Sequence, residues 1–263
     1  MADKDTKSKA SEGVRKKGFY LLPNIFTTGG LFAGFYAIVQ AMSGNYDHAA
    51  IAIFFALVMD GLDGRVARLT QTQSAFGSEY DSLSDMVSFG VAPALVIYVW
   101  ALQPLGRLGW VAAFIYCACA AIRLARFNVK LDIDNKKYFF GLPSPAAATL
   151  LASFIWISYD NGISGNDIFL GFFPMQWFAL LLTIFAALSM TTDLRFYSGK
   201  DINLRNSQPF IAILAIIFVF AIISHNPAEI IFLITLGYAL SGYFTFFKNK
   251  FSERSFLDVD IFK

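Results

Sequence analysis

Four aspartates within one short stretch carry the most distinctive chemistry of the chain. Asp60 and Asp63 are spaced i, i+3, and Asp81 and Asp85 are spaced i, i+4, so each pair lies on one face of a helix. Carboxylates gathered in this way either take up protons or bind hard cations, and oxygen ligands favour Mg²⁺, Mn²⁺ or Ca²⁺ over Zn²⁺. Arg68 adds a donor suited to phosphate. The pattern predicts a divalent-cation site that acts on phosphate groups.

A plainer interpretation is that these carboxylates are solvated charges at the ends of apolar helices. Two acids would fit that interpretation, but a set of four needs compensation, because each carboxylate costs about 2.5–3.5 kcal/mol at mid-depth in a membrane. The small residues Gly64, Ala67 and Gly77 lie between and beside the aspartates. They lack the bulk that would hold neighbouring backbones or a ligand apart. A short connection between the two helices would then bring the four carboxylates together.

The elements that position this cluster are predicted to be transmembrane helices. Of the 263 residues, 56% are apolar and only 15% are charged, whereas a soluble domain carries about a quarter charged residues. This composition excludes a water-soluble globule, and the net charge of +2 with scattered basic residues argues against nucleic acid as a partner. We therefore expect an all-α, polytopic transmembrane helix bundle.

Hydrocarbon thickness requires about 20 apolar residues per spanning helix. About eight spans meet this length, at residues 25–43, 49–67, 86–103, 108–126, 144–159, 170–190, 208–224 and 228–247. If the N-terminus is cytoplasmic, every Lys and Arg except Arg107 falls on the cytoplasmic side. We expect both termini in the cytoplasm, with a polar N-terminal segment at 1–18, a membrane domain at 19–247 and a polar tail at 248–263.

The aspartates belong to a string that resembles the signature of the CDP-alcohol phosphatidyltransferase family. Residues 60–85 match its pattern D-x-x-D-G-x-x-A-R-x8-G-x3-D-x3-D without a gap. The resemblance implies an integral membrane enzyme with a CDP-linked lipid donor, an alcohol acceptor and divalent cations, Mg²⁺ or Mn²⁺, with two per active site. It also implies a homodimer in a prokaryotic plasma (inner) membrane, with the active site facing the cytoplasm.

The same resemblance assigns roles to individual residues. The metal ligands would be Asp60, Asp63, Asp81 and Asp85, with Asp85 also acting as general base toward the acceptor hydroxyl. The CDP contacts would be Asn24, Thr27, Asp60, Gly64, Ala67, Arg68, Ser74 and Gly77. Considered as local chemistry alone, Asn24 is predicted to cap a helix that opens there, with a backbone amide near Thr27 as its partner.

The acceptor site is predicted at the end of the fourth span. Arg123 and Arg126 are spaced i, i+3 on one helix face, and Asn128 follows them. A plainer interpretation is that the arginines meet lipid headgroups. Together with residues 85–93 and 141–145, this segment resembles the phosphatidylserine synthase branch of the family, which implies L-serine as the acceptor, CDP-diacylglycerol as the donor, and phosphatidylserine and CMP as the products. The carboxylate of serine suits a guanidinium.

Two alternatives stay open at this point. The same chemistry could use glycerol 3-phosphate or an inositol phosphate as the acceptor. The guanidinium groups of the arginines would then bind the phosphate of the acceptor. An ion-coupled membrane transporter would use the four carboxylates as an intramembrane ion site, and it predicts acids near mid-depth and repeated halves in the sequence. The four aspartates lie on one side of the membrane in the predicted topology, and the chain shows no repeated halves.

Overall fold

The computed structural model describes residues 2–130, 138–169, 173–197 and 226–260. Helices dominate this part of the chain, and its β-structure is limited to two short antiparallel pairs, β1 with β4 and β2 with β3. In chain order the elements are α1 (Ala2–Met42), α2 (Tyr46–Leu69), α3 (Ala75–Asp85), η1 (Met86–Val91), α4 (Ala92–Ile97), η2 (Tyr98–Leu102), η3 (Gln103–Leu105), α5 (Arg107–Lys130), β1 (Tyr138–Phe140), α6 (Ser144–Asp160), β2 (Ile168–Phe169), β3 (Phe173–Pro174), α7 (Met175–Thr191), β4 (Arg195–Tyr197) and α9 (Pro227–Asp260).

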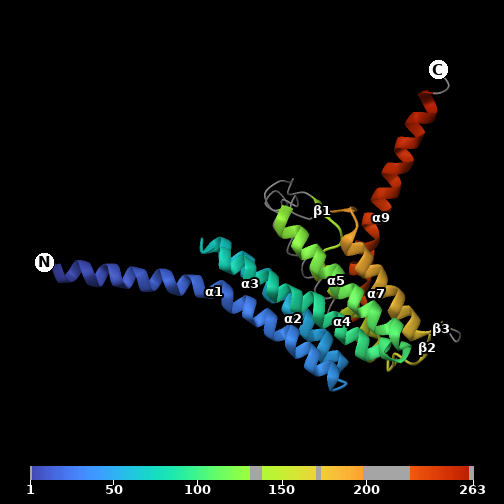
Figure 1. Cartoon of the computed structure of the whole chain (residues 1–263), viewed down its shortest axis with the longest axis horizontal. Coiled ribbons are helices and arrows are strands. Elements are labelled where there is room, and N and C mark those ends of the chain that lie inside the picture. The colour runs from blue at the N-terminus through green and yellow to red at the C-terminus, as the bar shows by residue number, and fades with distance from the viewer. Residues whose placement is uncertain (1, 131–137, 170–172, 198–225, 261–263) are drawn as a thin grey trace.

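The helices pack against one another as a bundle (Figure 1). α1 packs along α2 and also against α3, η1 and α4, while α5 packs against α7 and α6 contacts both α2 and α9. Gly34 permits a close approach of α1 to η1, since a Cβ there would lie 2.7 Å from the Cα of Ser88. Buried alanines line the same interfaces. Small residues at helix contacts are the means by which helices approach closely in a membrane.

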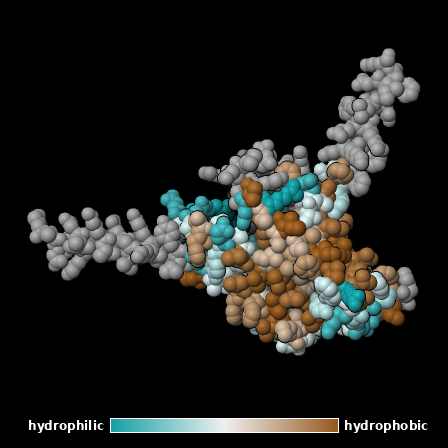
Figure 2. All heavy atoms as spheres, viewed as in Figure 1, coloured by the Kyte–Doolittle hydropathy of each residue, from teal (hydrophilic) through white to brown (hydrophobic). Residues whose placement is uncertain are grey.

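Four helical segments are long and apolar enough to cross a membrane: Leu22–Met42, Ala75–Leu105, Arg107–Val129 and Pro227–Phe246. Figure 2 shows a hydrophobic surface between two more hydrophilic ends of the molecule. These features confirm the predicted helical membrane protein. Seven of the eight predicted spans overlap described helices, and the segment 208–224 lies outside the described residues. The count of eight stays a prediction.

The third predicted span is part of a longer helical rod, the continuous segment Ala75–Leu105. It starts at Ala75, eleven residues before the predicted boundary at 86, and runs to Leu105 through two π-helical segments. The first of these, η1, begins directly after Asp85. The hydroxyl of Tyr116 donates a hydrogen bond to the carbonyl oxygen of Phe89 within η1, at 3.1 Å. π-Helical turns often occur at functional sites, and this one adjoins the aspartates.

The prediction that Asn24 caps a helix was wrong. α1 runs without a break from Ala2 to Met42 with Pro23 inside it, so Asn24 lies within the helix. Proline removes one backbone donor, and the helix continues across it. Side chains of the following turn bond to the carbonyls of this turn: Thr27 Oγ1 donates to the Pro23 oxygen at 3.2 Å, and Thr28 Oγ1 donates to the Asn24 oxygen at 2.7 Å.

α1 and α9 both extend beyond the bundle (Figure 1). The bundle part of α1 begins near Thr27, which contacts Asp63, and residues 2–21 precede it. On α9, Tyr243 contacts Ser189 near the end of α7, and the helix continues to Asp260. The extensions therefore leave the bundle at the end that also holds the aspartates.

Candidate metal and phosphate site

The four aspartates predicted as metal ligands converge in the structure. Carboxylate oxygens of Asp60, Asp63 and Asp81 lie within 4.8 Å of one another. Asp85 is in side-chain contact with Asp60, and Asp81 with Asp63. α2 supplies one pair, and the rod that begins with α3 supplies the other. An all-oxygen donor set at this separation fits a hard divalent cation, because one ion can reach three of the four carboxylates.

A tight connection between α2 and α3 brings the two pairs together. α2 ends at Leu69, and Gln71 adopts the left-handed conformation, with φ of 55°. The backbone N–H of Thr72 then donates to the Ala67 oxygen at 3.1 Å, which closes the helix end. Ser74 caps α3 by accepting a hydrogen bond from the Gly77 N–H at 3.0 Å. Local hydrogen bonds therefore fix the register of Asp81 relative to α2.

Hydrogen bonds from α1 hold the cluster from a third side. Thr27 Oγ1 donates to Asp63 Oδ2 at 2.9 Å, and Asp63 is only 5% exposed. In turn, Ser84 Oγ donates to the Thr27 carbonyl at 3.0 Å, and Ser88 Oγ donates to the Gly30 carbonyl at 2.9 Å. Sequence reasoning missed both serines, although their i, i+4 spacing, which matches that of Asp81 and Asp85, was a signal. Partners of this kind orient metal ligands in general.

Arg123 on α5 faces the cluster from the opposite side. Its guanidinium interacts electrostatically with Asp85 and Asp60. Nη1 donates to Ser144 Oγ at 2.6 Å, and Ser144 is fully buried at the start of α6. The Nε atom is buried and has no hydrogen-bond partner among the described residues. This free donor beside the carboxylates can bind an anionic group.

The other two predicted acceptor residues have different surroundings. Arg126 pairs with Asp193, which follows α7. Asn128 Nδ2 donates to Ser82 Oγ at 3.0 Å, next to Asp81. The structure therefore brings Arg123 and Asn128 to the aspartates, whereas Arg126 lies toward the α7 end.

Of the residues predicted to contact CDP, Thr27 and Asp60 lie inside the cluster, whereas Gly64 and Arg68 lie at its outer side. Gly64 is exposed, and a Cβ added there would meet nothing within 4 Å. Arg68 is also exposed and donates from Nε to the Gly64 carbonyl at 2.9 Å. A Cβ on Gly77 would lie 3.6 Å from Asn24 Oδ1, which places α1 beside the start of α3. Open space therefore adjoins Gly64, next to Asp63, where the family resemblance predicts a contact with CDP.

The carboxylates themselves line a narrow crevice inside the bundle. Its remaining lining residues are small or apolar: Thr27, Gly30, Ala56, Ser84, Ser88 and Phe89. Among the described residues, Arg123 is the positively charged side chain that interacts with Asp60 and Asp85. Four carboxylates facing one guanidinium leave an excess of negative charge, which a bound divalent cation would neutralise.

The fold and the site define a helical membrane protein with a carboxylate centre of the kind used in phosphoryl chemistry. The comparison with protein families specifies the class further. Residues 20–185 match the model of the CDP-alcohol phosphatidyltransferase family. The chain belongs to this family, which confirms the resemblance seen in residues 60–85.

Similar curated proteins carry one name. A CDP-diacylglycerol–serine O-phosphatidyltransferase of Helicobacter pylori strain J99 is 43% identical over 158 residues, which is 58% of this chain and 66% of that protein. Proteins of the same name from Mycobacterium tuberculosis strain H37Rv and Saccharomyces cerevisiae are 38% and 37% identical, over 57% and 55% of this chain and 54% and 59% of their own lengths. The aligned part of the chain thus spans less than two thirds of each of these relatives.

Proposed function

We propose that this protein transfers the phosphatidyl group of CDP-diacylglycerol to the hydroxyl of L-serine, giving phosphatidylserine and CMP. The observation that carries the proposal is the convergence of Asp60, Asp63 and Asp81, with Asp85 in contact and Arg123 opposite. The printed names of the relatives support the choice of donor and acceptor.

In the proposed arrangement the enzyme lies in a prokaryotic inner membrane with eight spans and acts as a homodimer. The polar segments 1–18 and 248–263 flank a membrane domain at 19–247, and both termini and the active site face the cytoplasm. Two features support this orientation: α1 and α9 extend from the aspartate end of the bundle, and in the predicted topology every Lys and Arg except Arg107 falls on the side of the N-terminus.

Asp60, Asp63, Asp81 and Asp85 would hold divalent cations, which we propose to be two Mg²⁺ or Mn²⁺ ions. Such ions polarise phosphate oxygens and neutralise charge that develops on them. Thr27 keeps Asp63 oriented through its hydrogen bond to Oδ2. The CDP moiety would contact the exposed Gly64 and Arg68, together with Asn24, Thr27, Asp60, Ala67, Ser74 and Gly77.

In the transfer step, Asp85 accepts the proton of the serine hydroxyl. The serine oxygen forms a bond to the β-phosphorus of the donor, the bond from that phosphorus to the CMP oxygen breaks, and the proton on Asp85 passes to solvent. The unpartnered Nε of Arg123 would bind the serine carboxylate, with Asn128 beside it and Arg126 at the rim. A guanidinium matches a carboxylate in both charge and hydrogen-bond geometry.

The acceptor is tested with purified protein, CDP-diacylglycerol, Mg²⁺ or Mn²⁺ and a panel of alcohols, with CMP release as the measurement. We expect release with L-serine, and none above background with glycerol 3-phosphate or inositol phosphate. Release with a phosphorylated alcohol in place of serine would overturn the acceptor assignment. Ion flux into vesicles without CMP release would favour a transporter instead.

The role of Asp85 is tested by Asp85→Asn. This change removes the basic oxygen and keeps the shape, so we expect CMP release to be abolished while binding of CDP is partly retained. CDP binding measured by calorimetry on the same preparation separates loss of the base from loss of the fold. Turnover by this variant would remove Asp85 from the role of base.

A further inference from the structure

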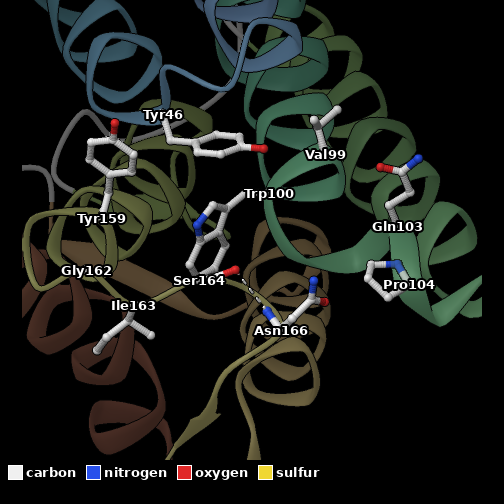
Figure 3. A pocket seen from close by; sticks show the side chains of 10 residues that line it. All are labelled: Tyr46, Val99, Trp100, Gln103, Pro104, Tyr159, Gly162, Ile163, Ser164 and Asn166. Atoms are coloured by element: carbon white, nitrogen blue, oxygen red, sulfur yellow. Dashed lines mark hydrogen bonds between the residues drawn. The ribbon is translucent and has the colours of Figure 1, made fainter.

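A second cavity lies at the opposite end of the bundle. It has a volume of about 820 Å³ and is lined from four parts of the chain: Tyr46, Val99, Trp100, Gln103, Pro104, Tyr159, Gly162, Ile163, Ser164 and Asn166 (Figure 3). Tyr46 opens α2 and Asp60 lies 14 residues later, so about 21 Å of helix separates this cavity from the aspartates. The proposed phosphatidyl transfer makes no use of this cavity.

Aromatic rings dominate the cavity where it meets the bundle. Trp100 is only 7% exposed. Its ring packs edge-to-face with that of Phe154, with ring centroids 5.4 Å apart. The rings of Tyr46 and Tyr159 meet at 70° with centroids 6.2 Å apart, and Figure 3 shows both beside Trp100. Tyr159 is 42% exposed, so it forms the rim while Trp100 forms the floor.

The loop that follows α6 forms the remaining wall and packs closely against Trp100 and Ala101. Gly165 is buried so closely against Trp100 and Ala101 that a Cβ would lie 2.6 Å from the Ala101 Cα. Within the loop, Ser164 N–H donates to Asp167 Oδ2 at 2.6 Å, and Asn166 N–H donates to Ser164 Oγ at 3.4 Å. These contacts connect the loop to Trp100 and Ala101 and to itself.

Charges around the cavity favour a cation. The lining carries no charged side chain, but Asp47 and Asp160 directly follow two of its tyrosines. Burial and the neighbouring carboxylate of Asp47 raise the pKa of Asp160, which shows that the two acids lie close enough to repel each other. Asp167 and Glu229 add negative charge at this end, and the exposed Arg107 opposes it; the ring of His48 is hydrogen-bonded to Asp47 Oδ1 at 3.1 Å.

We propose that this cavity, formed by Tyr46, Trp100 and Tyr159 beside Asp47 and Asp160, binds an organic ammonium group. Electron-rich ring faces attract such a cation, and the two carboxylates add a longer-range attraction. Gln103, Ser164 and Asn166 supply hydrogen-bond partners for the polar remainder of the ligand. The ammonium group belongs either to a phospholipid headgroup or to a free amine.

The test uses choline and its neutral isostere 3,3-dimethylbutan-1-ol with the purified full-length protein. Binding is followed by tryptophan fluorescence, and Trp100→Phe identifies the part of the signal that comes from the cavity. We expect saturable binding of choline and at least about tenfold weaker binding of the neutral compound. Equal binding of both compounds, or no binding of choline, would overturn the proposal.

Matched variants at the rim sharpen this test. Tyr159→Leu removes the ring and should weaken choline binding about tenfold, whereas Tyr159→Phe keeps the ring and should retain it. Asp160→Asn should weaken binding about threefold in low salt and less in high salt. CMP release by each variant reports that the protein is folded. Choline binding that is unchanged in Tyr159→Leu would contradict the proposed site.

The source of the ammonium group is distinguished in lipid nanodiscs. One preparation contains phosphatidylglycerol alone, and the other contains an added share of phosphatidylethanolamine. A headgroup site predicts weaker apparent choline binding in the second preparation, because the lipid competes. A site for a free amine predicts the same binding in both.

Discussion

The two ends of the bundle hold their polar groups in different ways. At the aspartate end, side chains from α1, α2, α3 and α5 bond to one another, and Thr27, Ser84 and Ser144 each connect two helices. At the opposite end, aromatic rings and a loop surround a cavity, and the hydrogen bonds of Ser164 and Asn166 lie within the loop. A charge cluster held by hydrogen bonds between helices suits chemistry that needs fixed geometry. An open aromatic cavity suits the binding of a ligand.

The sharpest way to break this comparison is to remove one carboxylate from each end. Asp60→Asn should lower the rate of CMP release by about 10³-fold, since it deletes a ligand from the cluster. Asp160→Asn should leave the rate within about twofold. Steady-state assays of both purified variants check this. Similar losses in the two variants would mean that overall charge, rather than the cluster, supports activity.

Within the aspartate end, the two arginines should differ in effect. Arg123→Gln should raise the KM for serine about 10–100-fold, because a hydrogen bond to a charged group contributes about 1.5–3 kcal/mol. Arg126→Gln should raise it only about threefold, because Arg126 is already paired with Asp193. Serine titrations at saturating CDP-diacylglycerol measure both.

Ser144→Ala serves as a control for the arginine comparison, because it leaves the guanidinium in place and removes one hydrogen bond to it. The KM for serine in this variant should lie between the wild-type value and that of Arg123→Gln. A larger effect from Arg126→Gln than from Arg123→Gln would reverse the assignment of the acceptor site.

A smaller effect is expected from the hydroxyl that orients Asp63. Thr27→Val removes its hydrogen bond and should raise the Mg²⁺ or Mn²⁺ concentration needed for half-maximal CMP release about tenfold. Thr27→Ser keeps the hydroxyl and should restore the wild-type value within about twofold. A metal titration that is identical for Val and Ser would show that the hydroxyl does not support the cluster.

The smallest effect should come from the loop at the opposite end. Gly162 has φ of 67°, a conformation that costs a side-chain-bearing residue about 1 kcal/mol or more. Gly162→Ala should therefore lower the thermal midpoint by a few degrees and leave the KM for serine unchanged. Gly237→Ala on α9 is the matched control, since a Cβ there meets nothing within 4 Å and helix propensity favours alanine. Equal midpoints for the two variants would contradict the argument.

The family motif made the convergence of the four aspartates predictable. Two pairs at i, i+3 and i, i+4 define helix faces whatever surrounds them, and the connection at residues 70–74 is too short to carry the pairs far apart. Asn24 was predicted wrongly because an asparagine favours a helix N-cap in isolation, whereas α1 continues through Pro23 and Asn24.

The sequence alone determined the membrane character, the acidic cluster and its suitability for a hard cation, because composition and local spacing settle these properties. The tertiary structure decided that Arg123 faces the aspartates while Arg126 pairs with Asp193. It also decided that Ser84 and Ser88 donate hydrogen bonds to α1. At the opposite end, it placed Trp100 beside Tyr46 and Tyr159. Each of these outcomes depends on which helix faces meet across long stretches of chain, and a periodic pattern does not specify that pairing.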